Sequence, residues 1–263
     1  MAELRMFSMQ DIKADPVAWL WEPYIPRGKI TIVQGDPGDG KTTMTLAIAA
    51  AVVNGESLPG GFADIPANVI FQTAEDGLAD TIKPRLEQLG ADCSRIHVID
   101  ESEQPLSLSD ERLEQAIVQT HAKLLIIDPI QAYLGGSDMN SARGMRLLMK
   151  SLGSVAERTG CTIIIIGHLN KKDGKAQYRG LGSIDIFAAA RSVLAIHRTG
   201  DNMRLAVQVK SNLARPGPAR LSRSALIPLS VLAGTANKIL TWTIFSTLRN
   251  QHTRVNPTKR NGL

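Results

Sequence analysis

Eight residues in the first fifth of the chain could hold a phosphate group. Residues 35–42 read Gly-Asp-Pro-Gly-Asp-Gly-Lys-Thr, a complete G-x-x-x-x-G-K-[ST] motif. An apolar run precedes this loop at residues 30–33, and a run rich in Ala and Leu follows it at residues 43–53. A strand before the loop and a helix after it are the context in which the motif binds nucleotide phosphates. The sequence therefore predicts a site for a nucleoside triphosphate.

The residue types within the loop suit this chemistry. Gly35, Gly38 and Gly40 have no Cβ, so backbone N–H groups can turn toward a phosphate, and the helix that follows adds partial positive charge. Lys41 is expected to reach the β- and γ-phosphates, and the Thr42 hydroxyl to coordinate Mg²⁺. We therefore expect ATP and Mg²⁺ as cofactors. The nucleotide is expected to contact Gly35, Asp36, Pro37, Gly38, Asp39, Gly40, Lys41, Thr42 and Thr43.

Carboxylates at the ends of two other apolar runs could complete a hydrolytic site. Asp128 has the position of a Walker B aspartate, which holds Mg²⁺ through water. In many P-loop ATPases a catalytic glutamate follows this aspartate, but Pro129 stands there and has no carboxylate. The base that polarises the attacking water must therefore come from another strand. Glu75 is our first candidate for this catalytic base and Asp76 is the second.

His168 ends the apolar run that follows the Walker B position. A polar side chain at such a strand end can donate to the γ-phosphate and transmit its loss to the adjoining loop. The alternative is a histidine with a structural role. We expect the catalytic role, because of the phosphate-binding loop earlier in the chain.

Apolar runs alternate with helix-forming stretches along the chain. We expect strands over residues 30–33, 68–73, 96–99, 124–127, 162–166, 193–196 and 205–209. We expect helices over residues 43–53, 78–89, 109–121 and 142–158, with a break at Pro84 and an N-cap at Ser109. Strands that are apolar on both faces indicate an α/β fold with a mostly parallel central sheet and helices on both faces. Such sheets bind ligands at the carboxyl ends of their strands.

The charge is unevenly distributed. All 25 acidic residues and 20 of the 30 Lys and Arg residues lie in the first 201 positions, so residues 202–263 carry ten bases and no acid. The basic stretch could bind a polyanion, or it could be a solvated chain end. Two unpatterned cysteines, Cys93 and Cys161, indicate a reducing compartment. No signal peptide and no membrane-spanning run is visible, so we expect a cytoplasmic protein without a membrane partner.

Four ordered motifs resemble one group of P-loop ATPases. They read WEPYIPRGKITIVQG, LLIIDP, IIIIGHLNK and YRGLGSIDIFAAARSVLAI. Together with Glu75 they resemble the RecA-like core of plasmid RepA-type hexameric helicases, which are related to the DnaB and KaiC ATPases. The resemblance covers residues 19–212, which we expect to form the ATPase domain. Residues 1–18 are expected to form an N-terminal arm, and residues 213–263, which depart from the family pattern, a basic C-terminal tail.

The resemblance implies further residue roles. Arg191 matches the arginine that those helicases insert into the ATP site of a neighbouring subunit, although a helix-end cation is the alternative. Residues 170–182 match a loop that faces nucleic acid, and Lys210 lies on a late strand whose basic end approaches a neighbour's phosphates. The cations expected to contact nucleic acid are Lys171, Lys172, Lys175 and Arg179.

We interpret the chain as a Mg²⁺-dependent ATPase that forms a ring, most simply a hexamer of identical subunits. It would act on single-stranded DNA as a helicase or translocase in plasmid or phage replication. The alternative is a RecA-like ATP-binding regulatory or recombination accessory protein without unwinding activity. A third interpretation is a decayed mobile-element protein that keeps its nucleotide site but does not assemble. The sequence does not distinguish DNA from RNA.

Overall fold

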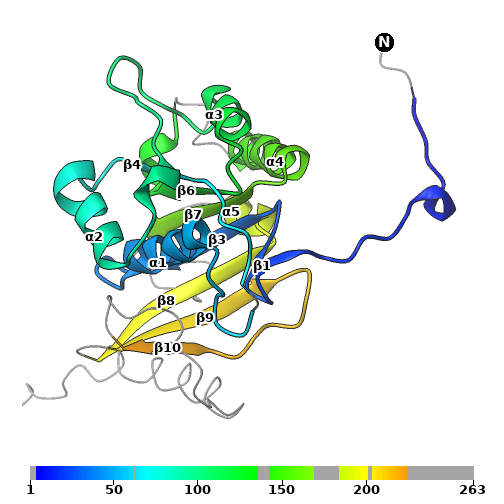
Figure 1. Cartoon of the computed structure of the whole chain (residues 1–263). Coiled ribbons are helices and arrows are strands. Elements are labelled where there is room, and N and C mark those ends of the chain that lie inside the picture. Colours follow the sequence, from blue (N-terminus) through cyan, green and yellow to red (C-terminus); the bar gives the residue numbers. More distant parts are fainter. Residues whose placement is uncertain (1–3, 62, 136–141, 169–183, 201–202, 224–263) are drawn as a thin grey trace, which may run out of the picture.

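The fold is described by a computed structural model for residues 4–61, 63–135, 142–168, 184–200 and 203–223. Within these residues the main sheet has eight strands in the order β10-β9-β8-β3-β7-β6-β4-β5 (Figure 1). Every pairing from β8 to β5 is parallel, whereas β9 and β10 add to the sheet in antiparallel fashion. The strands are β3 (Ile30–Gly35), β4 (Val69–Thr73), β5 (Ile96–His97), β6 (Leu124–Asp128), β7 (Thr162–His168), β8 (Ser192–Gly200), β9 (Met203–Ser211) and β10 (Arg220–Arg223).

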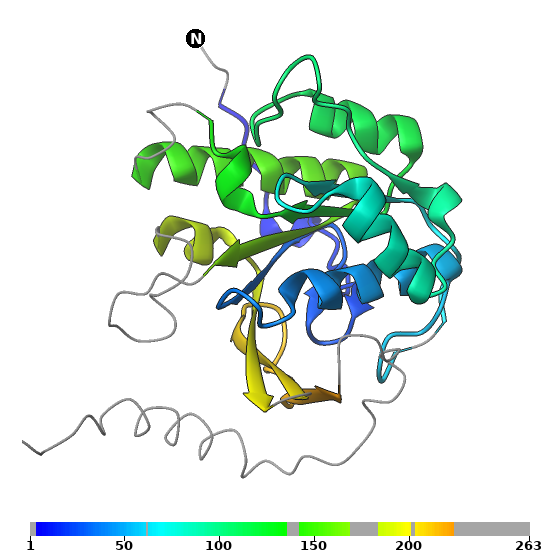
Figure 2. The ribbon, with the colours of Figure 1, turned by 90° about the vertical axis from the view of Figure 1, so that its left-hand side faces the viewer.

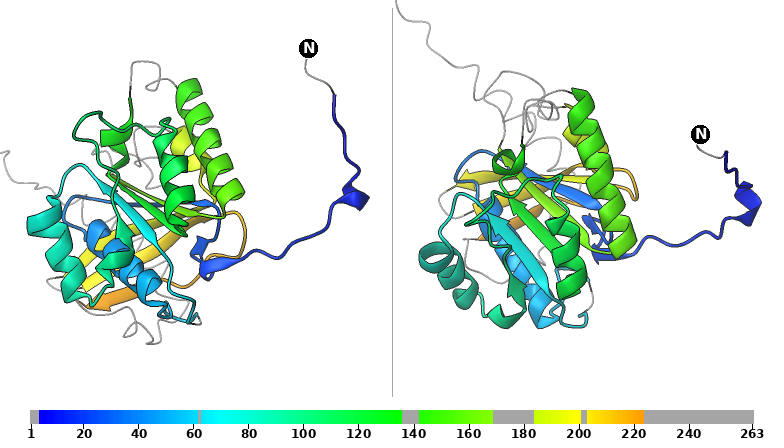
Figure 3. Two further views of the ribbon diagram at one scale, coloured as in Figure 1. Left: turned by 45° about the horizontal axis from the view of Figure 1, so that its top comes forward. Right: turned by 90° about the horizontal axis from the view of Figure 1, so that it is seen from above.

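Helices cover both faces of this sheet (Figure 3). One face is covered by α1 (Lys41–Asn54) and α2 (Lys83–Gln88), and by the small hairpin of β1 (Trp19–Trp21) and β2 (Ile25–Pro26). The other face is covered by α3 (Arg112–Thr120), α4 (Ala142–Thr159) and α5 (Ile184–Ala189). The prediction of an α/β fold with a mostly parallel sheet between two helical layers is confirmed. No helix in the described part of the chain combines the length and hydrophobicity that a membrane crossing requires.

The central strands contribute to a separate apolar core on each face. On β7, Ile163 and Ile165 pack with α3, α4 and α5, whereas Ile164 and Ile166 pack with α1 and α2. Successive side chains of a strand point to opposite faces, so a strand buried on both faces must be apolar throughout. The uninterrupted apolar runs of the sequence have this physical origin, and the sheet they form is a rigid base for the polar groups at its ends.

Three local expectations differ from the structure. Helix α3 begins at Arg112 instead of following an N-cap at Ser109, because the Asp110 carboxylate accepts from the Arg112 backbone N–H at 2.9 Å. Strand β5 is only two residues long. The break near Pro84 is present as a π-helical turn, Leu78–Ile82, which leads into α2 with proline in its first turn. Proline suits that position because the first-turn N–H groups of a helix have no intrahelical partner.

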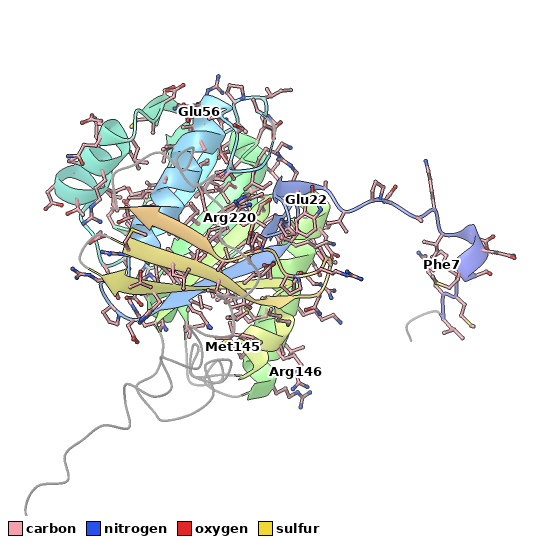
Figure 4. All side chains as sticks on the ribbon, turned by 90° about the horizontal axis from the view of Figure 1, so that it is seen from below. Phe7, Glu22, Glu56, Met145, Arg146 and Arg220 are labelled. Carbon is pink, nitrogen blue, oxygen red and sulfur yellow. The ribbon has the colours of Figure 1, made fainter. Side chains whose placement is uncertain are left out.

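The sheet does not stop at residue 212, where we expected the ATPase domain to end. Strand β10 pairs with β9, and the Tyr24 hydroxyl donates to the Pro218 carbonyl at 2.6 Å. Arg220, labelled in Figure 4, donates to the same hydroxyl at 3.0 Å and lies over the Tyr24 ring. Residues 213–223 are therefore tied to the sheet, whereas residues 224–263 lie outside the described part. At the other end, residues 4–18 form an arm that runs away from the sheet and carries the exposed Phe7 (Figures 1 and 4).

Candidate nucleotide-binding site

The pairing register brings four strand ends together at one end of the sheet, which we call the carboxyl end (Figure 2). Gly35, the last residue of β3, is level with His168 at the end of β7. Asp128, the last residue of β6, is level with Thr73, and its carbonyl accepts from the Ala74 backbone N–H at 3.2 Å. Residues that are far apart in the sequence therefore meet beside the loop that joins β3 to α1.

The loop itself has an open helix start. Gly40 is the N-cap of α1 with φ of 89° and no side-chain cap, and Gly38 also has a positive φ of 81°. Gly35 is needed for a different reason, since a Cβ at this position would lie 2.5 Å from the Ile196 carbonyl oxygen of β8. Gly35 does not have the positive φ of Gly38 and Gly40, and its lack of a Cβ permits close strand packing. The uncapped first turn of α1 presents N–H groups suited to an anion.

The Lys41 side chain is folded into the loop. Its ammonium donates to the carbonyls of Gly35 at 3.0 Å and Asp36 at 2.9 Å, and the residue is 5% exposed. Burial lowers the pKa of Lys41, and the nearby carboxylates of Asp39 and Asp128 act in the opposite direction. A buried cation held by weak carbonyl acceptors is positioned to exchange them for phosphate oxygens.

Thr42 and Asp128 form the polar pair at the centre of the site. The Thr42 hydroxyl donates to the Asp128 carboxylate at 2.6 Å, although 86 residues separate them. Burial raises the pKa of Asp128, the Thr42 hydrogen bond opposes this rise, and repulsion from Glu75 and Asp76 adds to it. Mg²⁺ takes oxygen ligands and removes the repulsion among carboxylates, so this hydroxyl and this buried carboxylate fit the ion.

Glu75 and His168 face each other across this centre. His168 Nε2 lies 3.5 Å from Glu75 Oε1, and the Glu75 side chain is 60% exposed and therefore accessible to water. The Nδ1 atom of His168 is buried and has no hydrogen-bond partner among the described residues. Asp76, the second candidate for the base, is instead paired with Arg85 at 3.2 Å. The two candidate acids therefore have different surroundings: Glu75 lies beside His168, and Asp76 is paired with Arg85.

Asp39 has a role in the loop that the motif does not reveal. Its carboxylate is buried and accepts from the backbone N–H of Asp36 at 2.9 Å and of Arg198, on β8, at 3.1 Å. Both oxygens therefore face the protein, and the side chain ties the phosphate loop to β8. The other side chains expected to contact nucleotide remain more accessible, with Asp36 and Pro37 exposed and Thr43 half-buried.

Arg191 lies at the opposite end of the sheet, which we call the amino end. Its backbone N–H donates to the carbonyl of Ile30, the first residue of β3, at 3.0 Å, and Arg191 is exposed. Gly35 comes five positions after Ile30 on β3, which is roughly 16 Å along a strand. Lys210 is close by, with its ammonium bound to the carbonyls that end α5, at Phe187 and Ala188. Arg191 therefore does not belong to the cluster around Lys41 of its own chain.

The four cations expected to contact nucleic acid lie outside the described residues. The structure adds a contact to the phosphate loop that the sequence analysis did not identify. The hairpin of β8 and β9 lies against the loop, with Arg204 beside Gly40. No sequence signal marks this contact, because Arg204 is separated from the loop by more than 160 residues and belongs to no motif.

The chain is similar to several known proteins. Residues 4–174 match the AAA domain family. The chain is 31% identical over 149 residues to DNA repair protein RadA of Halalkalibacterium halodurans and 30% identical over 161 residues to protein RecA of a Picosynechococcus species. These matches cover 55% and 57% of this chain but only 29% and 41% of the relatives. The chain thus matches less than half the length of either relative.

A solved structure shares the fold. The KaiC-like protein of Pyrococcus horikoshii superimposes with a TM-score of 0.57 at 17% sequence identity. The superposition covers 78% of this chain and 94% of that structure. At this identity the likeness concerns the fold alone. The family match and the RecA and RadA relatives, together with this shared fold, support a RecA-like P-loop NTPase. These similarities do not confirm that the chain belongs to the RepA-type helicases.

Proposed function

The chain belongs to the AAA domain family, and from this premise we propose that it is a Mg²⁺-dependent ATPase. The observation that carries the proposal is the meeting of Lys41, Thr42 and Asp128 at the carboxyl end of the sheet. The ammonium group, the hydroxyl and the buried carboxylate together meet the needs of a triphosphate and its metal ion.

Each side chain would have a defined part in hydrolysis. Lys41 would leave the loop carbonyls and neutralise charge on the β- and γ-phosphates, while Thr42 and Asp128 would hold Mg²⁺. Glu75 would accept a proton from the attacking water, because its carboxylate is solvent-accessible and adjoins the site. His168 would donate to the γ-phosphate and, when that phosphate leaves, return to Glu75.

We further propose that the active form is an assembly of identical chains, with a ring as the simplest form. Arg191 is exposed at the amino end of the sheet and remote from its own phosphate loop, so it is available to a neighbour's site. A head-to-tail contact of this kind repeats from subunit to subunit and closes into a ring if the rotation allows. The cations of residues 171–179 would then contact single-stranded DNA, and the assembly would translocate as a helicase.

The second candidate function is a RecA-like recombination or repair accessory that uses ATP without unwinding DNA. The sequence similarity to RadA and RecA favours this candidate, because their names state roles in DNA repair or membership of the RecA group. A strand-displacement assay separates the two functions. Duplex unwinding that requires ATP supports the helicase, whereas DNA-stimulated hydrolysis without unwinding supports the accessory protein.

The ATPase proposal is tested by hydrolysis and binding measurements on the wild-type protein and on Lys41→Ala. We expect hydrolysis that depends on Mg²⁺, rises with single-stranded DNA, and falls at least about 100-fold in Lys41→Ala. Circular dichroism should show that the variant keeps its fold. Full activity in Lys41→Ala would exclude the proposed phosphate site, and a lack of stimulation by DNA would count against the DNA-dependent motor.

A further inference from the structure

The side chain of Arg204, on β9, lies against the phosphate loop of its own chain. A Cβ placed at Gly40 would lie 3.2 Å from Arg204 Nε and 3.6 Å from its Cδ. Gly40 is the N-cap of α1 and is followed directly by Lys41. The guanidinium group is therefore held next to the residues that would surround the nucleotide phosphates.

The hydrogen bonds of this guanidinium group are incomplete. One terminal nitrogen donates to the Met203 carbonyl at 3.3 Å, whereas Nε is buried and has no partner among the described residues. No carboxylate within the described part of the chain forms an ion pair with Arg204. A buried donor without an acceptor costs free energy, more so on a charged group.

The surroundings add to this cost. Arg204 lies directly opposite Arg198 in the β8–β9 pairing, so its cross-strand neighbour is another cation and not an acid. The first turn of α1 contains no acidic residue, so its positive end is not compensated from within the helix. Asp39, the residue before Gly40, directs both carboxylate oxygens to backbone N–H groups. An anion in the loop would give both the Arg204 Nε and the uncapped first turn of α1 an acceptor.

We propose that Arg204 binds the phosphate chain of the nucleotide held in the loop of its own subunit. The inference rests on the proposed nucleotide site and adds a residue to it from the β8–β9 hairpin. Arg204 therefore differs from Arg191, which would act on a neighbour. Its planar group can donate from Nε and from a terminal nitrogen to two phosphate oxygens, which the ammonium group of a lysine cannot reproduce.

The test compares Arg204→Gln and Arg204→Lys with the control Arg215→Gln. Arg215 is exposed on the connection between β9 and β10, so its substitution removes the same charge away from the loop. We expect Arg204→Gln to weaken the equilibrium binding of both ATP and ADP about 10- to 100-fold, and Arg204→Lys to recover it only in part. Arg215→Gln should bind like the wild type.

A second readout excludes a purely structural role. Because Arg204 is uncompensated without ligand, Arg204→Gln should melt at the same temperature as the ligand-free wild type or higher. Pyrophosphate should raise the melting temperature of the wild type more than that of the variant. A lower melting temperature of the ligand-free variant, or unchanged affinity for ATP and ADP, overturns the inference. If Arg204→Gln binds ATP as the wild type does and Lys41→Ala does not bind it, the inference about Arg204 fails and the proposed nucleotide site stands. If the wild type does not bind ATP, the inference and the proposed nucleotide site both fail.

Discussion

The carboxyl end of the sheet buries Lys41 and Asp128, whereas the amino end exposes Arg191. Lys41 and Asp128 are each 5% exposed and lie in one cluster with Thr42. At the amino end, Arg191 is exposed and the ion pair of Lys29 with Glu157, at 2.7 Å, remains partly open to solvent. Buried charges are costly and are concentrated where a ligand will compensate them, while exposed cations are available to a second molecule.

The pKa directions express the same difference. Burial lowers the pKa of Lys41 and raises that of Asp128, so burial disfavours the charged form of each. At the amino end, the hydrogen bond from Lys29 lowers the pKa of Glu157 and so favours its charged form. Lys210 is the exception at this end, because burial and repulsion from Arg191 lower its pKa. The carboxyl end thus stores unfavourable electrostatic energy around Lys41 and Asp128 for a ligand to relieve, whereas Glu157 at the amino end is already stabilised in its charged form.

The largest effect is expected from Arg191→Ala. If the amino end completes the site of a neighbour, this change should lower the hydrolysis rate of the assembly about 1,000-fold. The affinity for ATP should be unchanged, because the loop is at the other end of the sheet. Steady-state hydrolysis and equilibrium binding measure the two quantities. Arg95→Ala is the control, since Arg95 forms a surface ion pair with Asp92 at 3.3 Å; equal effects of both changes would contradict the role of Arg191.

Glu75→Gln should lower the hydrolysis rate about 100-fold or more while ATP still binds. The variant removes the base and keeps the size of the side chain. The matched change Asp76→Asn should alter the rate only slightly, because Asp76 is paired with Arg85. Single-turnover hydrolysis compares the two. If Asp76→Asn lowers the hydrolysis rate more than Glu75→Gln does, Asp76 is the catalytic base.

Gly35→Ala should lower the free energy of unfolding by about 2 kcal/mol, because the new Cβ would meet the Ile196 carbonyl oxygen at 2.5 Å. Gly153→Ala, in α4, is a control that should instead raise the free energy of unfolding. Its Cβ would contact Ile30 Cδ1 at 3.9 Å, and alanine favours a helix over glycine by up to about 1 kcal/mol. Urea denaturation measures both; equal stability of the two variants would rule out the close approach at Gly35.

Asp128→Asn should make the ligand-free protein more stable at neutral pH, by about 1 kcal/mol, while weakening Mg²⁺-dependent nucleotide binding. The folded state raises the pKa of Asp128, so its charged form destabilises the fold above that pKa. The gain should shrink as pH falls through this pKa and vanish below the ordinary pKa of aspartate, because the wild-type carboxyl is then neutral in the folded and the unfolded state. Thermal melting across pH measures the gain, and a loss of stability at neutral pH would contradict this account.

The sequence predicts those features that depend on local patterns. The apolar runs indicate a parallel sheet, and the G-x-x-x-x-G-K-[ST] loop places Lys41 and Thr42. Pro129 directs attention to a base on another strand. Because strand ends meet at one end of a parallel sheet, the proximity of Glu75 and His168 also follows from the pattern.

The remaining features depend on packing between distant segments. The hydrogen bond from the Arg198 backbone to Asp39 spans 159 residues, and a carboxylate that binds a backbone N–H leaves no residue-type pattern at the donor. Arg204 also belongs to no motif, because it reaches the phosphate loop from a distant strand. The start of α3 depends on which neighbouring side chain reaches the free N–H groups, and Asp110 does so in place of Ser109. Strand β10 follows from its pairing with β9, since residues 220–223 have no apolar run.

The most direct test of the difference between the two ends mixes two inactive variants. Glu75→Gln keeps an intact amino end, and Arg191→Ala keeps an intact carboxyl end. When the two are co-expressed in equal amounts, about one quarter of the sites in a head-to-tail assembly combine two intact halves. We predict that hydrolysis recovers to about that fraction of the wild-type rate. Co-purified mixed assemblies that remain as inactive as either variant alone would contradict a site shared between subunits.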